Sequence, residues 1–127
     1  MLQTLKADIT TDASGDATVE LKPGINTNPT GFLHALKYTP GTIATGADLT
    51  LTGKDSGIPI LTVTNAGTSN VWYYPRALPN EVADASAGSS GTEWIPIHDE
   101  PVQVVVAQGG ATKAGSIEMF LLIKSPY

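Results

Sequence analysis

Residues 46–67, GADLTLTGKDSGIPILTVTNAG, hold two apolar runs separated by the tetrapeptide KDSG at positions 54–57. Apolar and polar residues alternate on both sides of that tetrapeptide, as they do along a strand with one buried face. Asp, Ser and Gly are common in turns because they stabilise or tolerate turn backbone angles. The stretch therefore predicts a hairpin that reverses at 54–57, with the threonines at 50, 52, 62 and 64 on its pleated surface.

The Asp-Ser-Gly triplet at 55–57 raises the alternative of a catalytic serine. A serine nucleophile needs a histidine base within hydrogen-bond reach, a carboxylate that orients the histidine, and donors for the oxyanion. The chain contains two histidines, His34 and His98, and no local pattern places either beside Ser56. We therefore interpret the triplet as a turn and predict no catalytic residue. A small hydrolase that uses His34 or His98 is the alternative.

The same alternation recurs along the whole chain. No stretch keeps the spacing of an amphipathic helix over three turns. Turns that contain glycine at 11–15 and 109–115 predict two more hairpins. The expected strands lie at 5–10, 17–22, 31–39, 48–52, 58–65, 71–74, 93–98, 102–108 and 116–124.

These strands predict an all-β fold in a single domain that spans residues 1–127. A chain of this length buries roughly 65% of its extended surface on folding, which is enough for one core. Short strands separated by Gly, Pro and Asn turns indicate a β-sandwich. A jelly roll of two four-stranded sheets fits best, with an immunoglobulin-like sandwich as the alternative. Alternation within 31–39 places Phe32, His34, Leu36 and Tyr38 on one face and Leu33, Ala35 and Lys37 on the other.

The charge balance and the lack of cysteine narrow the classes of partner. Lys and Arg total 7 against 12 Asp and Glu, so the net charge is −5 and no basic face is expected to bind nucleic acid directly. No apolar window is long enough to span a bilayer, and we expect neither a membrane span nor an export signal. Without cysteine the chain has no disulfide and no thiolate metal site, which suits a reducing cytosol.

No sequence pattern predicts a metal or a cofactor. The two histidines lack the close spacing of a zinc site. Asp12 with Asp16, and Asp99 with Glu100, lack the pattern of a calcium loop, so calcium is kept only as an alternative. Residues 110–116 have the glycine spacing of a phosphate loop but no lysine after the second glycine.

Four aromatic residues, Trp72, Tyr73, Tyr74 and Trp94, have the side chains that could stack on a sugar. Alternation puts Trp72 and Tyr74 on one face and Tyr73 on the other, so at least one of these faces belongs to the core. We favour core packing or partner contact for these residues. A carbohydrate- or receptor-binding module is the alternative.

Residues 76–92, RALPNEVADASAGSSGT, break the rhythm of the strands. The segment is rich in small residues and has no apolar period, so it predicts a long exposed loop. Loops of this length in small domains are often functional. We expect this loop to contact a partner, and a flexible connection is the alternative.

Six segments in order carry a resemblance to a known class of protein: ITTDASGDATVELKPGIN, GFLHALKYTPGT, TGADLTLTG, GIPILTVTNAG, WYYPRA and VQVVVAQGGATKAGSIEMFLLI. They resemble small β-rich structural proteins encoded in the virion gene clusters of tailed bacteriophages. The likeness extends over nearly the whole chain outside 78–92, and its motifs are turns and strands rather than reactive residues.

The resemblance implies a virion structural protein, above all a capsid decoration (cement) protein on the outer surface of the major capsid shell. It also implies a homo-oligomer, a dimer or a trimer, assembled in the host cytoplasm. A head–tail connector, tail or fibre-base component is the alternative within the virion. The segments 1–10, 76–92 and 125–127 are expected to contact the major capsid protein. The candidate contact residues are Leu2, Leu5, Arg76, Leu78, Glu81, Val82 and Tyr127.

Overall fold

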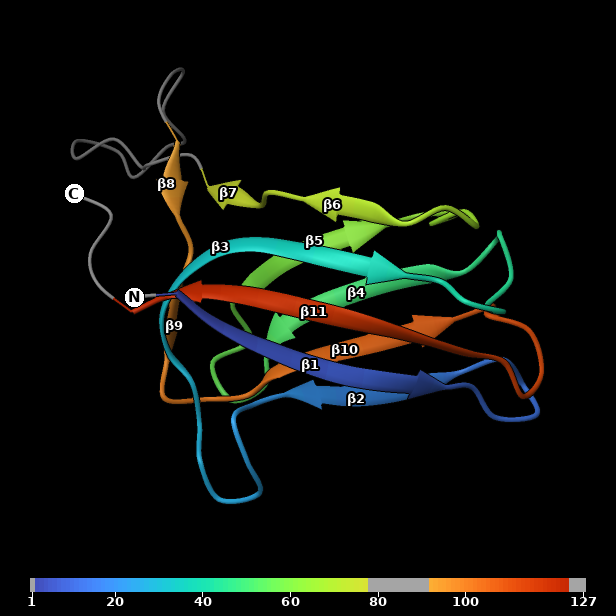
Figure 1. Cartoon of the computed structure of the whole chain (residues 1–127), viewed down its shortest axis with the longest axis horizontal. Helices are drawn as coiled ribbons and strands as arrows, with labels where there is room; N and C mark the ends of the chain where they lie inside the picture. The colour runs from blue at the N-terminus through green and yellow to red at the C-terminus, as the bar shows by residue number, and fades with distance from the viewer. Residues whose placement is uncertain (1, 78–91, 124–127) are drawn as a thin grey trace.

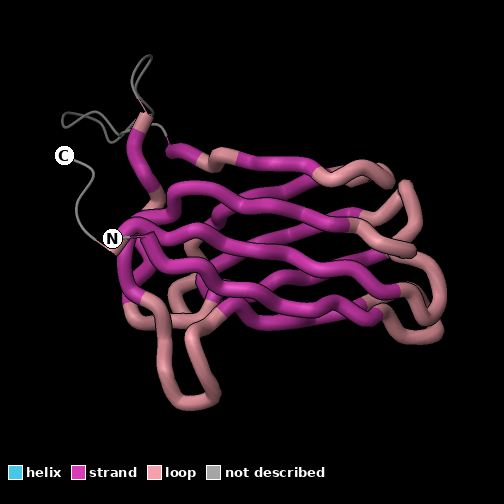
Figure 2. Tube along the Cα trace, in the orientation of Figure 1, coloured by secondary structure: helices cyan, strands magenta, loops and turns pink. Residues whose placement is uncertain are grey.

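Two curled antiparallel sheets pack face to face in the computed structural model, which describes residues 2–77 and 92–123 (Figure 1). Strands and loops make up all of this described part (Figure 2), and it contains no helix that could cross a membrane. The strands are β1 (Leu2–Thr10), β2 (Ala17–Leu21), β3 (Thr30–Thr39), β4 (Asp48–Gly53), β5 (Pro59–Val63), β6 (Val71–Tyr73), β7 (Arg76–Ala77), β8 (Glu93–Trp94), β9 (Pro96–His98), β10 (Val102–Ala107) and β11 (Ala114–Leu122).

The strand order is that of a jelly roll. Sheet A runs β1-β11-β3-β6, with β9 also paired to β3, and sheet B runs β2-β10-β4-β5. The short strands β7 and β8 pair only with each other. The pairs β1–β11, β2–β10, β3–β6 and β4–β5 form one antiparallel ribbon that is folded over itself, with its tip at the turn between β4 and β5. The predicted all-β sandwich is confirmed, and its topology is the jelly roll rather than the immunoglobulin-like alternative.

The predicted hairpin at 54–57 is correct, because β4 and β5 pair directly across it. The hairpins predicted at 11–15 and 109–115 are wrong. There β1 pairs with β11 and β2 with β10, so each turn is a corner where the chain passes from one sheet to the other. Turn residues are alike in hairpins and in corners, so local sequence does not separate the two.

The two corners are bonded to each other. The N–H of Thr11 donates to the Lys113 carbonyl at 2.9 Å, and the N–H of Gly109 donates to the Gly15 carbonyl at 2.8 Å. Thr11 is 2% exposed, and its hydroxyl donates to the Gly110 carbonyl and accepts from the Lys113 N–H. A Cβ at Gly15 would lie 2.9 Å from the backbone N of Gly110, so glycine is required for the corners to meet.

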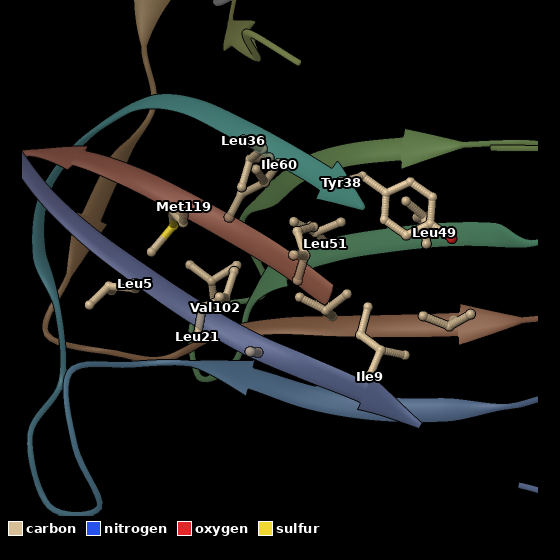
Figure 3. Close-up of a cluster of buried hydrophobic side chains, with 14 of the residues drawn as sticks. Leu5, Ile9, Leu21, Leu36, Tyr38, Leu49, Leu51, Ile60, Val102 and Met119 are labelled. Atoms are coloured by element: carbon tan, nitrogen blue, oxygen red, sulfur yellow. The ribbon is translucent and has the colours of Figure 1, made fainter. Parts of the chain in front are cut away.

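The core lies between the inner faces of the two sheets (Figure 3). Alternate residues of each long strand supply it, as the sequence predicts. Sheet A contributes Leu5, Ile9, Leu33, Leu36, Tyr38, Ile117, Met119 and Leu121, and sheet B contributes Leu21, Leu49, Leu51, Ile60, Val102, Val104 and Val106.

A bulge in β3 changes the predicted faces of that strand. Ala35 lies opposite Phe120 and Leu33 lies opposite Leu121, so His34 is an extra residue without a partner in the register. One extra residue shifts the alternation by one position. Leu33 therefore joins Leu36 and Tyr38 in the core, and the prediction that Phe32 and His34 share a face with them is wrong.

The turn at the tip of the ribbon is held by Glu100 from the loop between β9 and β10. One carboxylate oxygen of Glu100 accepts the N–H groups of Asp55 and Ser56 at 3.0 Å each and the Ser56 hydroxyl at 3.1 Å. The Lys54 N–H donates to the carbonyl of Pro101 at 2.9 Å. A Cβ at Gly53 would collide with the Glu100 carboxylate, so this close approach also requires glycine.

The tip is expected to be sensitive to acid. Its donors, first the Ser56 N–H, hold the pKa of the Glu100 carboxyl below its usual 4.5. A group with a lowered folded-state pKa stabilises the fold above its unfolded pKa, and this contribution is lost as pH falls through the folded pKa. We expect Glu100→Gln to lower stability at pH 7, and the difference from the native chain to shrink below about pH 4.5.

Urea unfolding at a series of pH values measures this difference. Asp16→Asn, at an exposed carboxylate, is the matched control because it removes a charge without touching the tip. A Glu100→Gln effect that stays constant from pH 7 to pH 3 would contradict the assignment.

The hydroxyl of Tyr38 is buried and has no hydrogen-bond partner in the described part of the chain. Burial raises the pKa of this phenol, because the charged form is poorly solvated there. Removal of an unsatisfied hydroxyl leaves the packing of the ring intact. We expect Tyr38→Phe to leave the free energy of unfolding unchanged or to raise it by up to about 1 kcal/mol.

Leu36→Ala is the comparison variant, and it should cost about 2–5 kcal/mol because it opens a cavity in the same core. Equilibrium denaturation compares the two. A Tyr38→Phe loss above about 1 kcal/mol would mean that the hydroxyl contributes a bond.

Candidate functional site

The outer surface of sheet A carries a group of apolar and aromatic side chains that we call the aromatic face. The register places Leu2 opposite Leu122, and Leu122 opposite Phe32. In the same way Lys37 faces Trp72 across β3 and β6. The neighbouring residues of these strands point into the core, so this set points outward. The aromatic face comprises Leu2, Phe32, Trp72, Tyr74, Phe120 and Leu122.

Trp72 lies at the centre of the contacts on this face. Its ring stacks on Phe120 with the centroids 5.1 Å apart and the planes at 26°. The Lys37 Nζ lies 5.7 Å from the centroid of the Trp72 ring, within the range of a cation–π contact. Trp72 is still 46% exposed, and Tyr74, two residues along, is 61% exposed. The face therefore offers two large exposed aromatic rings, and neighbouring side chains fix the orientation of the Trp72 ring.

A second aromatic cluster lies beside the bulge of β3. One guanidinium nitrogen of Arg76 donates to the carbonyls of Leu33 and His34 at 3.4 and 3.2 Å, and to the Pro75 carbonyl at 2.8 Å. The same guanidinium lies 4.3 Å from the centroid of the Trp94 ring. Trp94 in turn stacks on His34, with the centroids 5.2 Å apart. Arg76 thus satisfies backbone carbonyls at the bulge and ties the β7–β8 pair to sheet A.

The predicted contact residues fall into four groups. Leu2 is 50% exposed and belongs to the aromatic face. Leu5 is 4% exposed and its side chain lies in the core, because alternation along β1 turns it inward; it is not part of the exposed outer surface. Arg76 is half-buried and is engaged by the chain itself, and it starts strand β7 rather than a loop. Leu78, Glu81, Val82 and Tyr127 lie outside the described residues.

Half of the aromatic face, namely Phe32, Phe120 and Leu122, was not predicted as a contact surface. Trp72 and Tyr74 were expected to share a face, and they do, but the sequence did not say which face was the core. Phe32 was placed on the same face as Leu36 and Tyr38, which are buried, because the bulge at His34 has no local signal. For Phe120 and Leu122 the sequence does hold a signal. They alternate with Met119 and Leu121, which are buried, and alternation turns them to the outer face.

Three of the residues considered for catalysis or metal binding, Ser56, Asp12 and Glu100, accept hydrogen bonds from backbone N–H groups. The Ser56 hydroxyl donates to the Glu100 carboxylate and accepts the Ile58 N–H, so it contacts a carboxylate and not an imidazole. One Asp12 oxygen accepts the N–H groups of Ser14 and Asp16 at the corner, and the Asp16 bond chiefly lowers the Asp12 pKa. Residues 2–77 and 92–123 contain no detected pocket and no cluster of three potential metal ligands.

Comparison with known proteins adds little. No family model matches the chain, and no curated protein gives a significant match. A solved structure titled "Crystal Structure of FLHE" matches 94% of this chain and 95% of its own, with 14% sequence identity and a TM-score of 0.47. A likeness at this level carries no argument about function.

The contacts of Arg76 predict a structural role for that residue. We expect Arg76→Ala to cost about 2 kcal/mol or more, because buried carbonyls lose a charged donor and Trp94 loses its cation. Arg76→Lys should recover only part of this loss, since an ammonium donates but does not stack in a plane. Thermal denaturation measures both variants against Lys113→Ala, which removes an exposed charge. An Arg76→Ala protein as stable as this control would contradict the role.

Proposed function

We propose that this protein is a structural component of a tailed-bacteriophage virion, and specifically a capsid decoration protein that binds the outside of the major capsid shell. The observation that carries the proposal is the aromatic face of sheet A. It exposes Trp72, Tyr74 and Leu2 on a surface that the rest of the described chain leaves uncovered. Exposed groups of large apolar side chains mark interaction sites more often than they mark free surface.

The composition of the aromatic face is that of a protein interface. Aromatic residues are enriched at the centres of interfaces, where they bury much area with little loss of side-chain entropy. Here Trp72 is already held by Phe120 and Lys37, so binding would order little that is not ordered beforehand. The sequence resemblance described above supports a partner within the virion, and a capsid offers many copies of it.

Repetition on the capsid would compensate for a small contact. A specific interface buries about 1,600 Å² in total, and linked copies of a binding module gain avidity without any new contact. A homo-oligomer that places several aromatic faces on neighbouring capsomers would add the buried area of each contact and would gain avidity from their linkage. A connector, tail or fibre-base role would use the same face against a different virion protein.

A carbohydrate- or receptor-binding module is the second candidate, and the exposure of Trp72 and Tyr74 favours it specifically. Aromatic rings that are exposed and fixed in orientation are suitable platforms for sugars. The two candidates predict different ligands for one surface. They can therefore be compared with the same variants.

The test uses the double variant Trp72→Ala/Tyr74→Ala and undecorated phage heads. These heads are assembled from the major capsid protein of the virion to which this protein is proposed to belong. We expect the native chain to co-sediment with heads at micromolar concentration, and the double variant to bind at least about 30-fold more weakly, since a central aromatic contributes about 2 kcal/mol or more. Thr62→Ala, at an exposed residue of sheet B, is the control.

The outcomes separate the candidates. No co-sedimentation of the native chain with heads would rule out decoration. If the native chain binds a glycan array instead and the double variant does not, the carbohydrate candidate holds. Equal binding of native and double-variant chains to heads would place the contact away from the aromatic face.

A further inference from the structure

The free edge of β1 is the longest strand edge without a proline or a bulge in residues 2–77 and 92–123, and its charged residues, Lys6 and Asp8, are of opposite sign. β1 is the end strand of sheet A and stays in register with β11 from Leu2 to Thr10 without a bulge. Natural sheets usually block such edges with proline, bulges or very short strands. The other end strands are shorter or carry these features: β2 has five residues, β6 has three and is closely followed by Pro75, β9 has three and begins at Pro96, and β5 begins at Pro59 and has a bulge at Ile60.

The direction of the backbone groups on β1 follows from one hydrogen bond. The Thr11 N–H donates to Lys113, which continues the ladder toward β11. Successive residues of an antiparallel strand point their N–H and C=O groups to opposite sides. The even-numbered residues of β1 therefore point their backbone N–H and C=O groups away from β11. No described residue forms a hydrogen bond with these groups. These residues are Leu2, Thr4, Lys6, Asp8 and Thr10.

We propose that this edge binds the β1 edge of a second copy of the chain, antiparallel about a twofold axis through Ala7, so that Lys6 of each copy faces Asp8 of the other. In this register Thr4 faces Thr10, and Leu5 faces Ile9 on the inner side. Opposite charges and threonine pairs directly across two strands are both stabilising. Sheet A then continues across the axis as one sheet.

The charges select this register over its neighbours. Only even-numbered residues can exchange hydrogen bonds at this edge, so the strands can shift only in steps that keep even residues opposite one another. A shift of one step in one direction puts Lys6 opposite Lys6, and in the other direction Asp8 opposite Asp8. Like charges directly opposite destabilise a sheet. Lys6 and Asp8 are also 4.0 Å apart within one copy, so four alternating charges would surround the axis.

The inference stands on the edge strand alone and holds whether or not the capsid is the partner of this protein. A twofold contact is closed, because each edge is used once and no further copy can add to it. The contact would also remove the edge that could otherwise recruit unrelated strands.

The experiment exchanges the two charges. Analytical ultracentrifugation of the full chain should give a dimer at micromolar concentration. Lys6→Asp and Asp8→Lys should each weaken dimerisation by about tenfold or more, because attractive pairs become repulsive. An equimolar mixture of the two variants should form a dimer again, since the acidic edge of one then faces the basic edge of the other. Lys113→Asp, at an exposed corner, is the control and should dimerise like the native chain.

Three results would overturn the proposal. The native chain could sediment as a monomer throughout the micromolar range. Both single variants could dimerise like the control, which would place the interface elsewhere. The mixture could also stay monomeric although each variant melts like the native chain, which would exclude the register through Ala7.

Discussion

The folded ribbon of paired strands is the constraint on which the rest of this structure depends. Its tip is the turn at 54–57, and each later pair of strands continues the pair before it. The corners at 11–16 and 108–113 must then turn together, because one belongs to each strand of the ribbon. The hydrogen bonds between Thr11, Gly15 and residues 109–113 fix the two corners to each other. Both faces of the sandwich, and so the aromatic face, follow from this arrangement.

Polar groups that resemble the parts of active sites complete backbone hydrogen bonding in this fold. Glu100 accepts from the tip, Asp12 from a corner and Arg76 donates to the bulge. Each lies where the backbone leaves a ladder and its N–H or C=O groups need another partner. A charged side chain is well suited to this task because hydrogen bonds to charged groups are the stronger ones. In a fold with many turns, Asp, Glu and Arg therefore do not by themselves indicate a catalytic or metal-binding site.

Sequence reasoning recovered the class, the sandwich and the hairpin at the tip, because these depend on alternation and on turn residues within a few positions. It failed where distant segments decide. The partners of β1 and β2 lie near the other end of the chain, and no local pattern distinguishes a corner from a hairpin. The bulge at His34 depends on the match between β3 and β11.

The nested strand pairs also bear on how the chain finds its fold. Once β4 and β5 have met at the tip, the ends of the next pair are already near each other. Each further pair then closes a loop that is shorter than its own separation in sequence, and the difference is largest for β1 and β11. The entropic cost of closing a loop grows slowly with loop length, and here it is divided among successive pairs of strands. A fold with mostly long-range contacts can in this way form from its centre outward, which moderates the slow folding that such topology usually brings.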